Sequence, residues 1–280
     1  MKRRIDPNKP KIKIPFGKDY IRIKEIVEEN KLHTICQSGN CPNLAECWSA
    51  GTSTFMILGE ICTRSCKFCS VKTGRPLPPD QEEPERVARS VNLMHLKHCV
   101  LTSVDRDDLQ DKGVGFWVKV ITSIREKNPN ITIETLIPDF DGQENLLEKI
   151  VAVKPEVVSH NLETVERLTP QIRVKAQYKT SLKTLKYLAD RGITTKSGIM
   201  LGLGEEKQEI LSLMDDLLNV NCRILTIGQY LQPTKENISV KKFVSEEEFL
   251  ELKTIALKKG FRIVESGSLI RSSYHAEKHI

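Results

Sequence analysis

Six of the eight cysteines in this chain fall into two groups near its N-terminus. The downstream group, Cys62, Cys66 and Cys69, has the spacing C-x-x-x-C-x-x-C and directly follows the apolar run 54–59. The upstream group is made of Cys36, Cys41 and Cys47. Cysteines at such short spacing bind zinc or an iron–sulfur cluster in a reducing compartment, so both groups are candidate metal sites.

The number of ligands favours an iron–sulfur cluster over zinc in both groups. A structural zinc site takes four thiolate or imidazole ligands, and neither group has a fourth cysteine or a nearby histidine in a suitable arrangement. Three thiolates on a four-iron cluster leave one iron without a protein ligand, and a substrate or cosubstrate can bind at that open position. A zinc-bound structural or nucleic-acid-binding module is the alternative from another class of protein.

Length and composition set broad limits on the fold and the partners. The 280 residues suit one large α/β domain with extensions, or two modest domains. A formal net charge of +6 is too weakly basic to require nucleic acid as a partner. The first seven residues lack the apolar core of a secretory signal, and no apolar run approaches the roughly 20 residues of a membrane span. We therefore expect a cytoplasmic protein with no membrane partner.

Short segments rich in β-branched residues alternate with amphipathic ones along the chain. Strands are predicted at 56–59, 99–104, 131–137, 156–160, 195–200 and 224–228, and a final one at 261–265. Helices are predicted at 84–96, 116–127, 143–153, 181–191 and 205–220, and another follows the capping box 245–248. This alternation predicts right-handed βαβ units and a parallel sheet, and six strands are too few for a closed eight-stranded barrel.

The pattern allows either an open doubly wound sheet or a barrel around the thiols. We predict a partial six-stranded parallel (β/α)6 barrel. An N-terminal extension with the upstream cysteines is expected over 1–53, the barrel over 54–230, and a C-terminal helix, strand and tail over 231–280. We expect the tail to close the mouth of the barrel as an arm.

The downstream cysteines, with the aromatic Phe68 before the last of them, resemble the signature of the radical S-adenosylmethionine superfamily. From about residue 35 to the tail, the chain more specifically resembles the lipoyl synthase family. The matching stretches are CQSGNCPN (36–43), CW (47–48), ICTR (61–64), GRP (74–76), TSVDRDDL (102–109), LIPDF (136–140), HNLETV (160–165), KSG (196–198), GQYLQP (228–233) and RSSYHA (271–276).

The resemblance implies that the cluster on Cys62, Cys66 and Cys69 binds S-adenosylmethionine at its open iron. One injected electron then cleaves this cosubstrate to methionine and a 5′-deoxyadenosyl radical. Such a radical can remove hydrogen from an unactivated C–H bond, which no acid or base of a protein can do. These three cysteines are therefore implied to be catalytic.

The resemblance also implies a second, auxiliary four-iron cluster held by Cys36, Cys41, Cys47 and a serine of the Arg-Ser-Ser-Tyr motif, placed at Ser273. A serine oxygen is a hard ligand among soft thiolates, so its iron should be the easiest to release. This property suits a cluster that the family consumes as its sulfur donor. The second site would also join the two ends of the chain.

The implied reaction inserts two sulfur atoms at C6 and C8 of an octanoyl chain carried on a lysine. The implied partners are octanoylated lipoyl-carrier proteins, namely the glycine-cleavage H protein and the lipoyl domains of 2-oxoacid dehydrogenases, together with an electron donor and an iron–sulfur carrier. Another radical sulfur-inserting enzyme, such as an RNA thiotransferase, is the alternative. It is disfavoured because we expect no basic RNA-binding domain after the barrel.

Four polar residues at predicted strand ends are candidates for contacting S-adenosylmethionine. They are Ser103, Asp105, Asn161 and Glu163. Parallel α/β folds bind ligands at the carboxyl ends of their strands, although each residue could equally be a helix cap or a turn residue. His160 is expected to have a structural or substrate-orienting role.

The two remaining cysteines, Cys99 and Cys222, lie beside apolar runs. They are expected to be small core residues rather than ligands.

Overall fold

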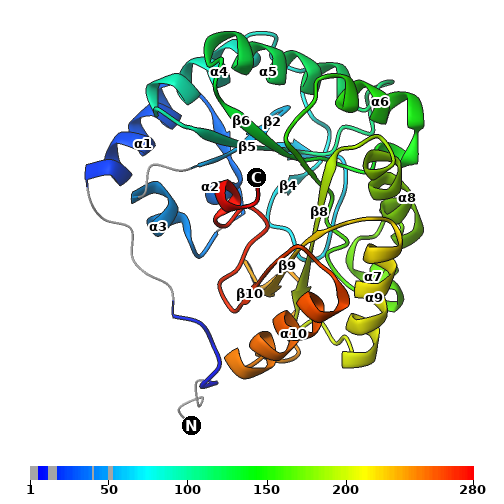
Figure 1. The fold of residues 1–280 in the computed structure, drawn as a ribbon. Helices are drawn as coiled ribbons and strands as arrows, with labels where there is room; N and C mark the ends of the chain where they lie inside the picture. The colour runs from blue at the N-terminus through cyan, green and yellow to red at the C-terminus, as the bar shows by residue number, and fades with distance from the viewer. Residues whose placement is uncertain (1–5, 12–17, 40, 50–52) are drawn as a thin grey trace.

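One curved, mainly parallel sheet organises the molecule (Figure 1). The computed structural model describes residues 6–11, 18–39, 41–49 and 53–280. The strands follow one another across the sheet in chain order: β1 (His33–Thr34), β2 (Thr54–Ile57), β5 (His98–Ser103), β6 (Thr132–Leu136), β7 (Val157–Ser159), β8 (Thr194–Leu201), β9 (Ile224–Gln229) and β10 (Ile263–Gly267). Every pair is parallel except β1 with β2.

The six predicted barrel strands are confirmed as β2 and β5 to β9. The predicted final strand also forms, and it pairs with β9 to extend the sheet. On the other side, the two-residue strand β1 adds an antiparallel edge that its short pattern does not reveal. The sheet order runs from β1 to β10 without closing among the described residues, as expected for a partial barrel.

The predicted helices cover the outside of the arc of strands (Figure 1). They are α4 (Glu83–Leu93), α5 (Val114–Lys127), α6 (Glu144–Ala152), α8 (Tyr178–Ala189), α9 (Lys207–Asn219) and α10 (Glu246–Lys259). The predicted capping box forms at the start of α10, where Ser245 and Glu248 bond reciprocally, and the left-handed Gly260 ends the helix. Among the described residues, no helix is long and apolar enough to cross a membrane.

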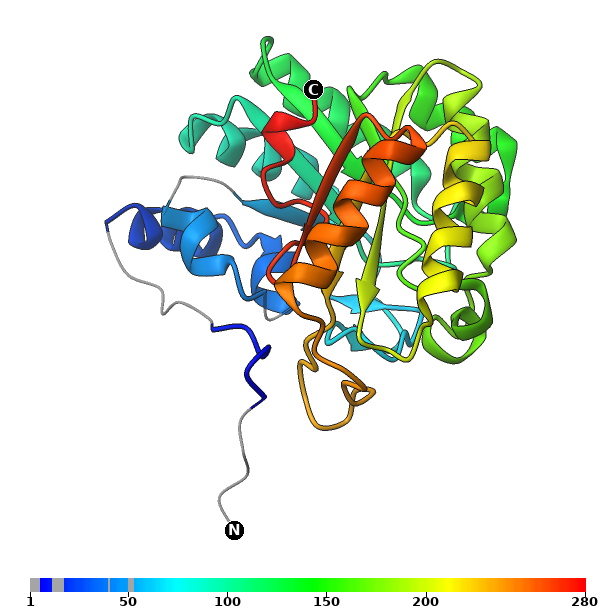
Figure 2. The ribbon, with the colours of Figure 1, turned by 60° about the horizontal axis from the view of Figure 1, so that its bottom comes forward.

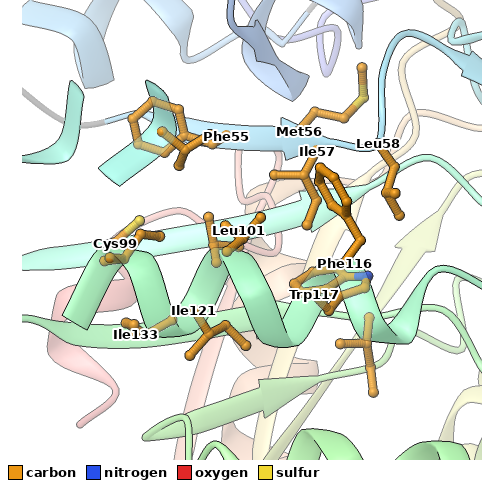
Figure 3. Close-up of a cluster of buried hydrophobic side chains, with 14 of the residues drawn as sticks. Phe55, Met56, Ile57, Leu58, Cys99, Leu101, Phe116, Trp117, Ile121 and Ile133 are labelled. Carbon is orange, nitrogen blue, oxygen red and sulfur yellow. The ribbon is translucent and has the colours of Figure 1, made fainter. Parts of the chain in front are cut away.

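The core between the sheet and its outer helices is densely apolar. Phe55, Leu101, Trp117 and Ile121 are fully buried where β2 and β5 face α5 (Figure 3). Cys99 lies in this cluster. A second apolar cluster lies around β8, β9, α9 and α10 and includes the buried Cys222. Both cysteines are core residues, as predicted.

The inner side of the arc is where the strand ends, the segment with the upstream cysteines and the C-terminal tail come together. The register sets Thr102 opposite Leu136 and Leu136 opposite Ser159, so the loops after β5, β6 and β7 leave the sheet along one edge. The C-terminal tail lies beside the N-terminal helices α2 (Ile35–Ser38) and α3 (Leu44–Ser49) in both views (Figures 1 and 2). The boundaries at 53/54 and 230/231 between the N-terminal extension, the barrel and the C-terminal part stay a prediction.

Candidate active site

The loop with the downstream cysteines begins at a tight turn after β2. Leu58 and Gly59 both have positive φ, of 70° and 93°. Leu58 has a side chain, so its left-handed backbone must be held by its surroundings. The buried Glu83 carboxylate accepts the Leu58 backbone N–H at 2.9 Å. The turn therefore directs the chain out of the sheet and into the loop 62–69.

Backbone hydrogen bonds tie the loop to the carboxyl ends of the strands. The Thr63 N–H donates to the carbonyl of Asp105 at 3.0 Å, just after β5. The Lys67 N–H donates to the carbonyl of Ile172 at 2.8 Å, at the end of the short helix α7 (Thr169–Ile172). The loop is thus held by two separate parts of the barrel.

Arg64, within the loop, links it to two further loops through buried ion pairs. Its Nε donates to Asp107 at 2.8 Å, and its terminal nitrogen donates to Asp139 at 2.8 Å. Burial acts to raise the pKa of Asp107, but the hydrogen bonds from Arg64 and Lys175 outweigh it and hold this pKa below its usual range. Sequence reasoning did not assign Arg64 a role. The sequence feature that could have indicated a role is the position of this charged residue between two candidate ligands, Cys62 and Cys66.

The thiols are surrounded by donors suited to sulfur that carries negative charge. The backbone N–H groups of Asp105 and Arg64 donate to Cys62 Sγ at 3.3 and 3.4 Å, and that of Val71 donates to Cys69 Sγ at 3.4 Å. Hydrogen bonds to sulfur are one of the means by which proteins tune iron–sulfur clusters.

Burial controls the protonation of these thiols. It raises the pKa of Cys62 to about 11 and that of Cys66 to about 12, with the Asp105 carboxylate adding to both shifts. At neutral pH these groups therefore need a bound cation to become thiolates. Their donor set fits an iron–sulfur cluster.

A cavity of about 340 Å³ brings the downstream cysteines and the four polar strand-end residues together, whereas the predicted ligands of the auxiliary cluster are not among the residues that line it. The three cysteines of the loop line it, and so do Ser103, Asp105, Asn161 and Glu163. Much of the remaining wall is apolar, including Met56, Val71, Leu136, Met200 and Leu231.

The four polar residues differ in how they are held. Ser103 Oγ is buried and has no hydrogen-bond partner among the described residues. Glu163 adopts a left-handed backbone with φ of 65°, and burial raises its pKa. Burial likewise raises the pKa of Asp105 to about 6, although Arg64 opposes this shift. An unpartnered hydroxyl and desolvated carboxyls in one cavity are typical of a ligand-binding site.

His160 also lines the cavity, but both of its ring nitrogens are engaged in the protein. Nδ1 lies 2.9 Å from the carbonyl oxygen of Ile137, and Nε2 lies 2.8 Å from Ser181 Oγ. Burial, with the neighbouring Arg173, lowers the pKa of His160 to about 4, so the ring is neutral at physiological pH. These contacts give it the structural role that was predicted as one of two options.

The upstream cysteines lie on the N-terminal segment that borders the same space. Cys36 is in α2, Cys47 is in α3, and Cys41 lies in the connection between them. The Cys41 N–H donates to the Cys36 carbonyl at 3.0 Å, and burial raises the pKa of Cys36 to about 11. Asn40, within this stretch, lies outside the described residues.

The C-terminal motif contacts this segment directly. The Asn43 side chain donates to the carbonyl of Leu269 at 2.7 Å, and the Tyr274 hydroxyl donates to Glu46 at 2.7 Å. Arg271 is close enough to Cys41 for their charges to interact. Two segments far apart in the sequence, 41–46 and 269–274, therefore meet beside the second thiol group. That a cluster joins them stays a prediction.

Among the described residues, no three His, Cys, Asp or Glu side chains converge closely enough to share one metal ion. The assignment of particular cysteines and of Ser273 as ligands stays a prediction.

Comparison with known proteins identifies the family. The family model for the radical SAM superfamily matches residues 56–217. The chain is 58% identical over 274 residues to a lipoyl synthase of Treponema denticola, covering 98% of this chain and 94% of that protein. The chain belongs to the lipoyl synthase family. A mitochondrial lipoyl synthase of Nematostella vectensis is 56% identical over 280 residues, covering 98% and 96%.

Solved structures show the same fold at much lower sequence identity. The hydrogenase maturase HydG from Carboxydothermus hydrogenoformans matches with a TM-score of 0.64 and 14% identity, covering 87% of this chain and 64% of that one. Methylornithine synthase matches with a TM-score of 0.58 and 14% identity, covering 79% and 72%.

Membership of the lipoyl synthase family defines the chemistry in broad terms. The chain is a sulfur-inserting enzyme of the radical SAM type in lipoate biosynthesis. Its cofactors are S-adenosylmethionine and four-iron, four-sulfur clusters, and its substrates are lipoyl-carrier proteins.

Proposed function

We propose that this enzyme inserts sulfur at C6 and C8 of a protein-bound octanoyl-lysine, with its reaction centre in the cavity lined by Cys62, Cys66 and Cys69. The observation that carries the proposal is the composition of that cavity, in which the thiols face four polar strand-end residues and a largely apolar wall. A polar end suits the amino-acid and ribose groups of S-adenosylmethionine, and an apolar wall suits an alkyl chain. A cluster on these cysteines would supply the electron that cleaves the cosubstrate.

The polar residues would bind and orient the cosubstrate. The carboxylates of Asp105 and Glu163 would accept hydrogen bonds from ribose hydroxyls or the ammonium group, and Ser103 and Asn161 would bond its remaining polar atoms. Arg64, which also lines the cavity, would hold Asp105 in place, because its Nε lies 3.3 Å from that carboxylate. The apolar wall would exclude water from the reacting atoms.

The auxiliary cluster would be held by Cys36, Cys41 and Cys47, with Ser273 as the fourth ligand. The neighbouring Ser272 donates its hydroxyl to Asn161 Oδ1 at 3.1 Å, so it is already engaged. The bond to Asn161 leaves Ser273 as the serine that we propose for the ligand.

Membership of the family supports more specific partners. The carrier proteins would be the glycine-cleavage H protein and the lipoyl domains of 2-oxoacid dehydrogenases. An electron donor would serve the first cluster and an iron–sulfur carrier would rebuild the second. None of the eight cysteines forms a disulfide, which suits an enzyme of the reducing cytoplasm.

Anaerobic reconstitution and turnover on an octanoyl-lysyl peptide test this proposal. We expect about eight irons and eight sulfides per chain, since two four-iron clusters require them. Mass spectrometry should then detect the addition of two sulfur atoms to the peptide. A protein that holds zinc without sulfide, or that leaves the peptide unchanged while cleaving S-adenosylmethionine, would contradict the proposal.

A further inference from the structure

The last residues of the chain turn back into the interior of the barrel. After Tyr274 the chain forms the short 3-10 helix η3 (Ala276–Lys278), and the side chain of His279 is fully buried. Arg262 donates to the backbone carbonyl of His279 at 3.2 Å. In Figure 1 this segment lies within the arc of strands. The C-terminal tail, defined here as residues 268–280, is thus attached to the barrel at a point beyond Ser273.

His279 meets a buried ion pair that belongs to the sheet. Lys196 on β8 and Glu134 on β6 have side chains 0% and 1% exposed, and Lys196 Nζ lies 2.7 Å from Glu134 Oε1. Ser159 on β7 donates to the same oxygen at 3.0 Å. Nδ1 of His279 lies 3.0 Å from Lys196 Nζ and 4.0 Å from Glu134 Oε2.

These distances define the role of the imidazole. The ammonium group of Lys196 has only donors, so in this 3.0 Å contact Nδ1 of His279 is the acceptor. Without His279, Lys196 would keep Glu134 as a partner, but the buried ammonium would lose its second acceptor and with it part of the compensation for its desolvation. Moving the tail away from Lys196 is therefore unfavourable.

We propose that His279 is a positioning residue whose hydrogen bond with Lys196 anchors the C-terminal tail and thereby keeps Ser273 in place on the auxiliary cluster. The inference rests on the proposed function, in which Ser273 is a ligand of that cluster. Tyr274, which bonds to Glu46, fixes the tail next to Ser273, and His279 fixes its far end. Ser273 is then held by attachments that do not depend on the cluster itself.

Three variants of the full, cluster-loaded chain test the anchor. His279→Leu removes the acceptor nitrogen and replaces the imidazole with an apolar side chain of similar size. His279→Asn keeps an acceptor oxygen near the position of Nδ1 and deletes the Nε2–H, which has no hydrogen-bond partner among the described residues. A chain that ends at Lys278 removes the ring without burying a replacement, so the test stands even if His279→Leu fails to fold.

Two readouts are needed, and neither is turnover. Amide hydrogen exchange over residues 268–280 reports whether the tail is held, and the rate at which a chelator removes iron reports the retention of the auxiliary cluster. We expect His279→Leu and the shortened chain to lose protection in the tail and to release that iron roughly tenfold faster, because a hydrogen bond to a charged group is lost. His279→Asn should stay close to the unmodified chain.

Unchanged tail protection in both His279→Leu and the shortened chain would overturn the inference, and so would an Asn variant that behaves like the Leu variant. Lost protection with unchanged iron release would overturn the positioning role. Ser273→Ala then shows whether the anchor or the assignment of Ser273 as a ligand is wrong. If Ser273→Ala releases iron faster, the ligand set stands and only the anchor fails. If it does not, the ligand assignment itself is wrong.

Discussion

Ser272 and Ser273 are adjacent in the chain but differ in their surroundings. Ser272 donates to Asn161, which lines the cavity beside the downstream cysteines. Ser273 lies in the chain between Arg271, which is close to Cys41, and Tyr274, whose hydroxyl donates a hydrogen bond to Glu46. One serine therefore faces the proposed S-adenosylmethionine site, and the other is available to the auxiliary cluster.

Single alanine substitutions should separate these two roles. Ser273→Ala should weaken the auxiliary cluster and release its iron at least about tenfold faster, because a ligand is lost. Ser272→Ala, the matched control, should keep that cluster and weaken S-adenosylmethionine binding, because Asn161 loses the donor that orients it. Iron content, chelation rate and cosubstrate affinity measure these effects. A full auxiliary cluster with unchanged spectra and turnover in Ser273→Ala would point to Ser272 instead.

Among the elements, the start of α4 has a direct effect on the thiol loop. Glu83 in the first turn of α4 is buried and accepts the backbone N–H of Leu58, in the left-handed turn that leads to Cys62. Burial raises the pKa of Glu83 to about 7. The helix therefore contributes a proton-binding group to the turn that directs the loop.

This raised pKa predicts a pH-dependent stability. Between the ordinary pKa of 4.5 and the raised value of about 7, the folded protein binds the Glu83 proton more tightly than the unfolded chain does. Protonation of Glu83 therefore adds to the free energy of unfolding at low pH, and this addition falls as pH rises and is gone above about pH 7. From pH 6 to pH 8 the loss should be about 1 kcal/mol. Anaerobic unfolding by urea at several pH values should show this fall in the free energy of unfolding for the unmodified protein. The dependence on pH should be flatter in Glu83→Gln. Equal slopes in both proteins would contradict the assignment.

The elements were predictable to the extent that their patterns are local. Long β-branched segments predicted β5 and β8, and amphipathic periodicity predicted the outer helices. The two-residue strand β1 and the four-residue helix α7 were missed because so few residues carry no periodicity. The pairing of β10 with β9 was also missed, because sheet neighbours are set by tertiary packing.

The candidate site was predictable in its chemistry but not in its supporting contacts. The cysteines were recognised by spacing and family resemblance, and four strand-end residues by the rule that parallel sheets bind ligands at that edge. The pairs that hold the site, Arg64 with Asp139 and Lys196 with His279, join residues from distant parts of the chain. No local pattern marks such partners.

At the scale of the whole molecule, the barrel and the two chain ends have separate tasks. The barrel positions the downstream cysteines and the cavity, whereas the upstream cysteines, the proposed ligands of the auxiliary cluster, lie where the N-terminal helices meet the C-terminal tail. Because different parts of the fold hold the two thiol groups, radical generation and sulfur donation should be separable by mutation.

The most direct test of this account replaces Cys36, Cys41 and Cys47 together with alanine and measures two products of one anaerobic reaction. The account predicts that the variant still forms 5′-deoxyadenosine from S-adenosylmethionine but adds no sulfur to an octanoyl-lysyl peptide. Loss of both products, in a variant that keeps its downstream cluster, would contradict the separation of the two sites, and so would continued sulfur insertion.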